Sequence, residues 1–144
     1  MNYDSMFTFA NQFALAGWLI LLFYPKFPKF VQLTCGLLIP VLLSIAYTGL
    51  IMANWGSGEG DFGSLSGVMT LFTQPAAVLA GWIHYLAYDL FVGAWIARTA
   101  MKEKIHYLFV VPCLPVALMF GPAGYLLFNA IRAGRTGFKS NPAQ

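Results

Sequence analysis

Charged residues are scarce in this sequence: they make up 9% of its 144 residues, whereas soluble domains carry about a quarter. Hydrophobic residues make up 59%, and the mean hydropathy is +0.69. The apolar residues form long blocks rather than alternating faces, which indicates an integral membrane protein and excludes a soluble domain. The basic residues lie in short clusters at the block ends, where lipid headgroups would meet them, so we expect no nucleic-acid binding.

The sequence has two cysteines and two histidines and lacks the usual motifs of metal or nucleophilic chemistry. Cys35 and Cys113 lie in apolar segments without a CxxC pair, which disfavours a disulfide framework or a zinc site. There is no GxSxG motif and no phosphate loop. Helical rise separates His84 from His106 by about 20 Å along the predicted bundle, too far for one haem or zinc ion. We therefore predict no metal and no cofactor.

Apolar blocks long enough to cross a bilayer lie at about 5–24, 31–53, 75–98 and 106–130. Pro40 predicts a kink in the second block, and three prolines predict a fourth block that is bent or locally unwound. Glycines after residue 54 predict a loop, and the short apolar pattern at 64–74 predicts an interfacial or re-entrant helix. The predicted fold is a single all-α transmembrane domain, residues 1–144, with four transmembrane helices plus that short helix.

Four crossings would place both termini and the 54–74 loop on one side of the membrane. More basic residues lie in the opposite loops, so the positive-inside rule predicts that both termini are outside the cytoplasm. The first block has neither a basic leader nor a cleavage site, and we expect a retained helix rather than a signal peptide. Without a transit segment, the predicted location is a bacterial cytoplasmic membrane.

His84 and Asp89 are ionisable residues inside the third apolar block. Such a group costs roughly 2.5–3.5 kcal/mol or more in hydrocarbon, so both should face protein or trapped water, and both are catalytic candidates. Five residues place them about 140° apart around the helix. Neighbours must therefore contact this helix on two sides, which predicts that it is central. For Asp89, an anchor for helix packing and a chemical role remain open alternatives.

The depth of each residue below the loop side of the membrane can be estimated from helical rise. By this estimate, polar groups of the other blocks lie at a depth near that of His84. The candidate binding residues are Asn11, Gln12, Tyr47, Thr48, Tyr88, Gly121 and Pro122, with Glu59 and Asp61 in the loop above. One interpretation is a structural network that fixes the helices. The other is an apolar-walled cavity with one titratable imidazole, open toward the loop.

Several motifs resemble the abscisic-acid-deficient-four-like membrane proteins: Phe62-Gly-Ser-Leu-Ser-Gly67, Trp82-Ile-His84 through Asp89-Leu-Phe91, His106, and Gly121-Pro122-Ala-Gly124. The resemblance spans about residues 5–132. Plant members are chloroplast proteins needed to make neoxanthin from violaxanthin, and many bacterial members have no assigned role. The resemblance implies a link to carotenoid or isoprenoid chemistry and directs attention to His84 and Asp89.

Two functions follow as hypotheses. The first is a membrane enzyme that isomerises a carotenoid-like or isoprenoid lipid without a cofactor, with His84 as general acid/base. Asn11, Gln12 and Tyr47 would orient the polar end of the substrate, and Glu59 or Asp61 would line the entrance. The second is a non-catalytic pigment or lipid carrier, or an assembly partner of other membrane enzymes. The expected partners are the bilayer and a hydrophobic small molecule; a homo-oligomer remains open.

Overall fold

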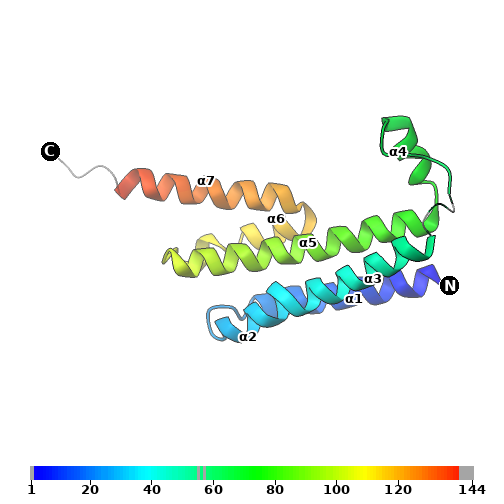
Figure 1. Ribbon diagram of the computed structural model, residues 1–144. Helices are drawn as coiled ribbons and strands as arrows, with labels where there is room; N and C mark the ends of the chain where they lie inside the picture. Colours follow the sequence, from blue (N-terminus) through cyan, green and yellow to red (C-terminus); the bar gives the residue numbers. More distant parts are fainter. Residues whose placement is uncertain (1, 55, 57, 140–144) are drawn as a thin grey trace.

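The computed structural model describes residues 2–54, 56 and 58–139, with side chains up to residue 135. The elements are α1 (Tyr3–Leu21), α2 (Pro28–Leu33), the π-helical η1 (Thr34–Leu38), α3 (Ile39–Asn54), α4 (Leu65–Leu71), α5 (Pro75–Lys102), the short turn η2 (Tyr107–Phe109), α6 (Cys113–Met119) and α7 (Gly121–Lys139) (Figure 1). No strand occurs among these residues, so the all-α prediction is confirmed.

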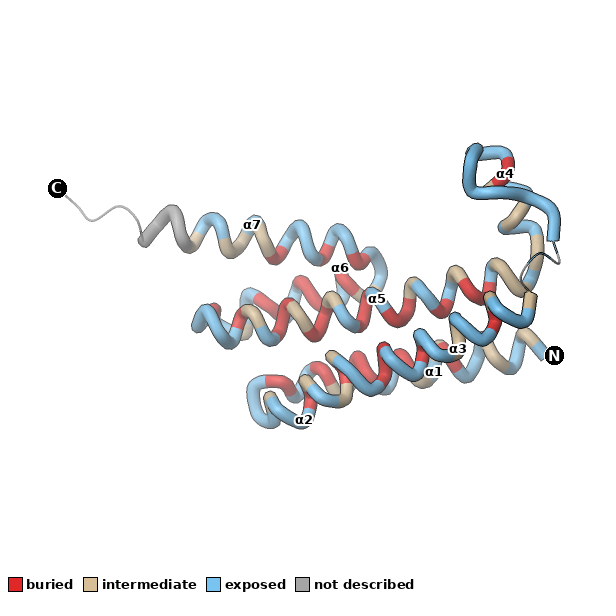
Figure 2. Tube along the Cα trace, viewed as in Figure 1, coloured by how far each residue is buried: buried red, intermediate tan, exposed pale blue. Residues whose placement is uncertain are grey.

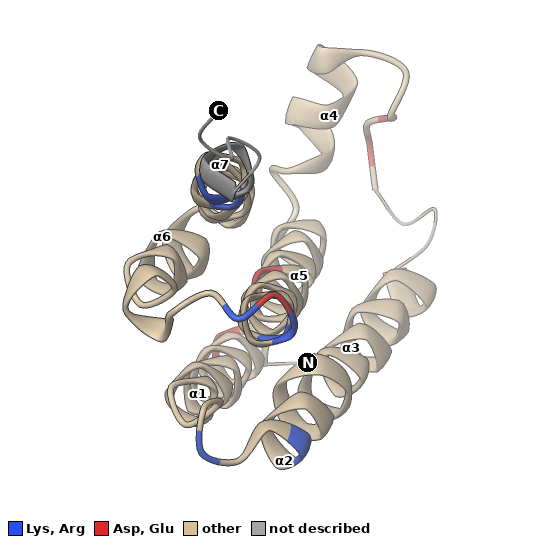
Figure 3. Ribbon diagram, turned by 90° about the vertical axis from the view of Figure 1, so that its left-hand side faces the viewer, with Lys and Arg blue, Asp and Glu red and all other residues tan. Residues whose placement is uncertain are grey.

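α5 is the central helix, as its two ionisable residues predicted. It packs against α1 and α3 on one side and against α6 and α7 on the other. Buried positions recur along its length (Figure 2), and the view along the bundle in Figure 3 places it between its neighbours. At Gly93, a Cβ would lie 2.6 Å from the ring of Trp18, so glycine allows α1 to approach closely.

Helices α2, η1 and α3 form one continuous helix over Pro28–Asn54. Pro40 lacks a backbone N–H, and its ring crowds the carbonyl one turn earlier. The chain responds with the π-helical turn directly before it, in which the Ile39 N–H bonds to the Thr34 carbonyl. Two helices of the described chain, Pro28–Asn54 and Pro75–Lys102, are long and apolar enough to cross a membrane.

The block predicted over 106–130 is not one helix but is interrupted at Phe120. α6 ends at Met119, Phe120 is extended, and α7 then runs back alongside α6. The two helices approach closely at Gly124, where a Cβ would lie 2.5 Å from the backbone of Ala117. Pro122 prevents a continuous helix because it cannot donate to the carbonyl of residue 118. Residues 107–139 are therefore a helical hairpin, whose tip is Phe120–Pro122.

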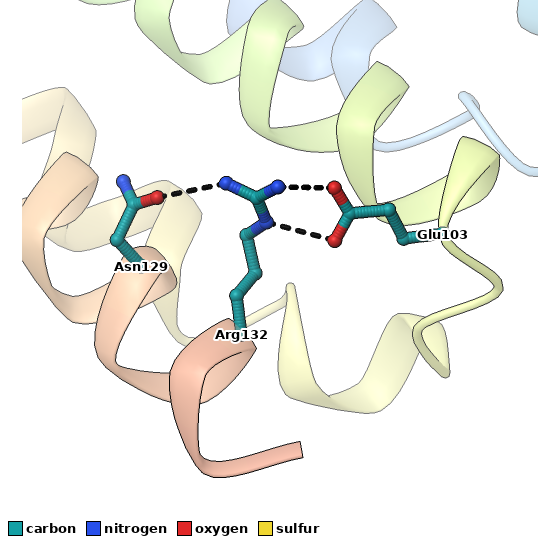
Figure 4. A network of polar contacts seen from close by, with 3 residues as sticks. All are labelled: Glu103, Asn129 and Arg132. Atoms are coloured by element: carbon teal, nitrogen blue, oxygen red, sulfur yellow. Dashed lines mark hydrogen bonds and ion pairs between the residues drawn. The ribbon is translucent and has the colours of Figure 1, made fainter. Parts of the chain in front are cut away.

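An ion pair fixes the open end of this hairpin beside the end of α5. The guanidinium of Arg132 donates to both carboxylate oxygens of Glu103, at 2.8 Å from Nε, and to the Asn129 side chain at 3.0 Å (Figure 4). The bond from Arg132 lowers the pKa of the Glu103 carboxyl. The pair therefore stabilises the fold above the ordinary pKa of a glutamate and is lost as the pH falls through the lowered value.

The hairpin also changes the expected position of the termini. The start of α1 and the end of α7 lie at opposite ends of the bundle (Figure 1). The prediction that both termini lie on one side of the membrane assumed a fourth crossing at 106–130, and it stays a prediction. Counting residues could not distinguish a crossing from a hairpin, because both fill a 25-residue apolar block.

The short helix predicted within 64–74 is confirmed as α4. Ser64 caps it, with its hydroxyl accepting from the Gly67 N–H at 3.0 Å. The Asp61 carboxylate holds the preceding turn by accepting from the N–H groups of Gly63 at 2.6 Å and Ser64 at 3.1 Å. Gly60 has a φ of +108° and lies against α4, where a Cβ would approach the Gly67 carbonyl oxygen to 2.5 Å.

Gly124→Ala should destabilise the hairpin, because the added methyl would overlap the Ala117 backbone. We expect a loss of about 1–3 kcal/mol in the free energy of unfolding, as for other overpacked sites. The matched control is Gly134→Ala in the same helix, where a Cβ meets nothing within 4 Å. That change should stabilise by up to about 1 kcal/mol through helix propensity. Unfolding in detergent measures both, and equal gains in the two variants would contradict the close helix contact.

Candidate functional site

The candidate site is a cavity of about 430 Å³ between α3, α5 and the loop with α4. His84 and Tyr47 line its inner part, and Asp61 lies on the loop side. The remaining walls are largely apolar: Leu50, Ile51, Phe62, Leu71, Phe72, Ala76, Ala77 and Ala80 line them, with several glycines, Asn54 and Gln74. The cavity can therefore hold an apolar molecule that carries a polar group at one end.

His84 lies between two tyrosine rings. Its imidazole centroid is 4.6 Å from the ring of Tyr88, one turn later on α5, and 5.7 Å from the ring of Tyr47 on α3. The side chain is exposed, and within the described residues its nitrogens have no hydrogen-bond partner. An imidazole with free nitrogens can bind a polar group or exchange a proton with it.

The two acidic residues of the loop occupy different places. The Asp61 side chain lines the cavity of His84 while it holds the turn before α4. Glu59 does not line this cavity; its backbone carbonyl accepts from the Gln74 amide at 3.0 Å, and the residue borders a neighbouring hollow near Tyr3. Only Asp61 of this pair can meet a molecule bound beside His84.

The predicted single polar layer is wrong, since its members lie on different sides of α5. Asn11 accepts from the Trp82 indole N–H at 3.1 Å, in the seam between α1 and α5. Gln12 is exposed on α1, and the Thr48 hydroxyl donates to the Ser44 carbonyl of its own helix at 2.8 Å. Residue counting gives the depth of a side chain but not the direction in which its helix face points. Of the candidate residues on other helices, Tyr47 lies beside His84, while Tyr88 contacts it from α5 itself and Asp61 lines the same cavity from the loop.

Asp89 faces the hairpin tip and does not line the cavity of His84. It is 5% exposed, the backbone N–H of Gly121 is its hydrogen-bonding neighbour, and the Tyr85 hydroxyl lies close by. A Cβ at Gly121 would lie 2.0 Å from the Asp89 Oδ1, so glycine is required there. Its other oxygen, Oδ2, has no partner among the described residues. Asp89, Gly121 and Pro122 thus belong to one junction between α5 and the hairpin.

Tyr85, one turn before Asp89 on α5, belongs to the same junction. Its hydroxyl donates toward the carbonyl oxygens of Leu118 at 3.3 Å and Met119 at 2.5 Å. Pro122 leaves the carbonyl of residue 118 without its helical donor, and the tyrosine satisfies it. The spacing of Tyr85 four residues before Asp89 places the two side chains on one helix face, which predicts that they lie together.

The described residues contain no group of three His, Cys, Asp or Glu side chains that could hold a metal ion. His106 lies beyond the end of α5, where its Nδ1 accepts from the Leu108 N–H at 3.3 Å. Cys35 is buried and donates to the Gly17 carbonyl at 3.1 Å. The expectation of a protein without metal or cofactor stays a prediction, which elemental analysis and an absorbance spectrum can test.

A model of the ABA DEFICIENT 4-like family matches residues 5–128. The chain belongs to this family. The match extends from α1 into α7 and includes both the His84 cavity and the hairpin tip. No curated protein and no solved structure matches the chain.

Asp89→Leu should destabilise this ABA DEFICIENT 4-like protein, because the Gly121 N–H would lose a buried acceptor. An unsatisfied buried group costs about 1–3 kcal/mol. Asp89→Asn retains one acceptor oxygen and should cost less. Unfolding of the purified protein in detergent compares the three forms, and a leucine variant as stable as the parent would show that Asp89 does not hold the hairpin.

Proposed function

We propose that the protein is a multi-pass membrane protein in which α1, the Pro28–Asn54 helix and α5 cross the bilayer. The α6–α7 hairpin would enter and return on the side of the α5 C-terminus. Large apolar side chains on the outer surface support this, among them Leu19 (57% exposed), Phe30 (60%) and Ile45 (63%). For a protein with this topology, a bacterial cytoplasmic membrane is the proposed location.

We further propose that the His84 cavity binds a carotenoid-like or other isoprenoid lipid. The observation that carries the proposal is an imidazole with free nitrogens, placed between Tyr47 and Tyr88 in a mostly apolar cavity. Aromatic rings offer flat faces to a conjugated or branched apolar chain. Membership of the ABA DEFICIENT 4-like family supports the same class of ligand, because its plant members are needed for carotenoid synthesis.

The proposed reaction is an isomerisation by proton transfer. His84 would remove a proton from one carbon of the lipid, a double bond would shift, and the proton would return at another atom. Such a step needs no oxidant, reductant or cofactor. Tyr47 and Asp61 are placed to hold the polar end of the substrate, while Asp89 acts as a positioning residue that fixes α5 against the hairpin.

The second candidate function is non-catalytic binding of a pigment or lipid. It is favoured by the exposed position of His84, since a site that transfers protons usually excludes water. In this case the tyrosine rings and the imidazole would bind the ligand without changing it, and the protein would deliver it to other membrane enzymes.

His84→Gln separates the two functions. A strain that lacks the protein should accumulate an unconverted isoprenoid lipid, and the parent gene should restore its profile. We expect that His84→Gln does not restore it, because glutamine cannot exchange a proton near neutral pH. The control is His106→Gln, which alters the other histidine at the far end of α5 and should restore the profile.

Full restoration by His84→Gln would rule out acid/base chemistry at this residue. If that variant restores the profile and also retains lipid through purification as the parent does, the carrier function is the correct one. Lipid chromatography of the strains and of the purified proteins supplies both results.

A further inference from the structure

A second hollow, of about 610 Å³, lies in the seam between the Pro28–Asn54 helix and α5, at the end away from His84, where α2 and η1 face α5. Lys29 at the start of α2 and Arg98 near the end of α5 both line it. Both cations are exposed, and neither has a carboxylate partner in the described part of the chain, where the ion pair joins Arg132 to Glu103. Two unpaired cations from different helices thus border one hollow, which favours an anionic occupant.

Gln32 lines the same hollow. Its side chain folds over Gly36 in the π-helical turn, where a Cβ would lie 2.2 Å from the amide nitrogen. The amide oxygen is buried and has no hydrogen-bond partner among the described residues. An unsatisfied buried acceptor is costly, and rotation of the amide toward the hollow would let a ligand hydroxyl satisfy it.

The hollow continues into an apolar groove along the same seam. A neighbouring space of about 250 Å³ shares Gly36 and Leu37 with it and is lined further on by Pro40, Tyr88 and Phe91. From Arg98 to Tyr88 the groove covers ten residues of α5, or about 15 Å of helical rise. One end of the groove is therefore cationic and its walls further along are apolar. This arrangement fits an amphipathic molecule with an anionic headgroup and a hydrocarbon chain.

We propose that this groove is a binding site for an anionic phospholipid, with the phosphate between Lys29 and Arg98 and one acyl chain along the seam. Both cations lie at the end of an apolar helix, the level at which headgroups meet a membrane protein. Figure 3 looks onto this end of the bundle, where blue segments mark the basic residues around α2 and α5. The cationic end of this site lies apart from the His84 cavity, and the apolar groove ends at Tyr88, whose ring contacts His84. The proposal does not depend on the function of that cavity.

The test is native mass spectrometry of the purified protein with added phosphatidylglycerol or phosphatidylcholine. Lys29→Gln with Arg98→Gln should weaken phosphatidylglycerol binding about tenfold. The matched control is Lys26→Gln with Lys102→Gln, which removes two cations from the same end that do not line the hollow; binding should be unchanged. Leu37→Trp keeps both cations but fills the groove, and should also weaken binding.

Equal losses in the two double variants would overturn the site and indicate diffuse attraction to the basic end. Equal binding of phosphatidylcholine and phosphatidylglycerol would overturn it as well, because the site would not select net charge. Geranylgeranyl phosphate provides a competition test. If it displaces bound phosphatidylglycerol, and phosphatidylglycerol does not displace it, the occupant is a prenyl phosphate and the phospholipid assignment is wrong. Lys29→Arg with Arg98→Lys conserves charge and should retain binding, which separates lost charge from misfolding.

Discussion

The contact between Asp89 and the hairpin tip is the interaction on which the rest of the structure depends. A carboxylate in the middle of an apolar helix is unfavourable unless polar groups surround it. The break at Phe120 supplies them, because a chain that turns there exposes the Gly121 N–H. Glycine at 121 is required for the same contact, and Tyr85 satisfies the carbonyls that the turn leaves free. The buried carboxyl group and the broken helix therefore stabilise one another.

The same contact explains how one helix serves two sites. α5 presents Asp89 to the hairpin and His84 to the cavity, five residues and about 140° apart. Fixing the helix on the hairpin side also fixes the rotation at which His84 meets Tyr47 of α3. The glycine-rich loop and α4 then cover the cavity, held by the turn at Asp61. The cavity thus combines a rigid inner part on two helices with a wall made by a loop.

The sequence predicted those parts of the fold that depend on composition and on spacing within one helix. The helical class, the short helix after Ser64 and the central place of α5 all follow from residues close together in the chain. At Pro40 the sequence predicted a kink, and the structure has a π-helical turn before it within a continuous helix. The hairpin did not follow, because a 25-residue apolar block with three prolines fits a bent span as well as a turn. The spacing of Gly121, Pro122 and Gly124 was a signal for close packing, but its partner Ala117 lies in the preceding helix.

The candidate site shows the same limit. His84 and Tyr47 lie together, whereas Asn11 pairs with Trp82 in another seam of the bundle. Depth along a helix can be counted from the sequence, but the face that meets a given neighbour depends on how the helices rotate and cross. For the same reason Asp89 shares a helix with His84 and yet belongs to a different contact.

The topology of the chain in its membrane tests the hairpin most directly. In a protein whose Cys35 and Cys113 are changed to alanine, a single cysteine replaces Ser5, Lys102 or Gly134. A membrane-impermeant maleimide then labels that cysteine in intact cells and in opened cells. A re-entrant hairpin predicts that positions 102 and 134 are labelled from the same side and position 5 from the other. Labelling of positions 5 and 134 from one side, with 102 on the other, would mean that the last block crosses the membrane and would contradict the account.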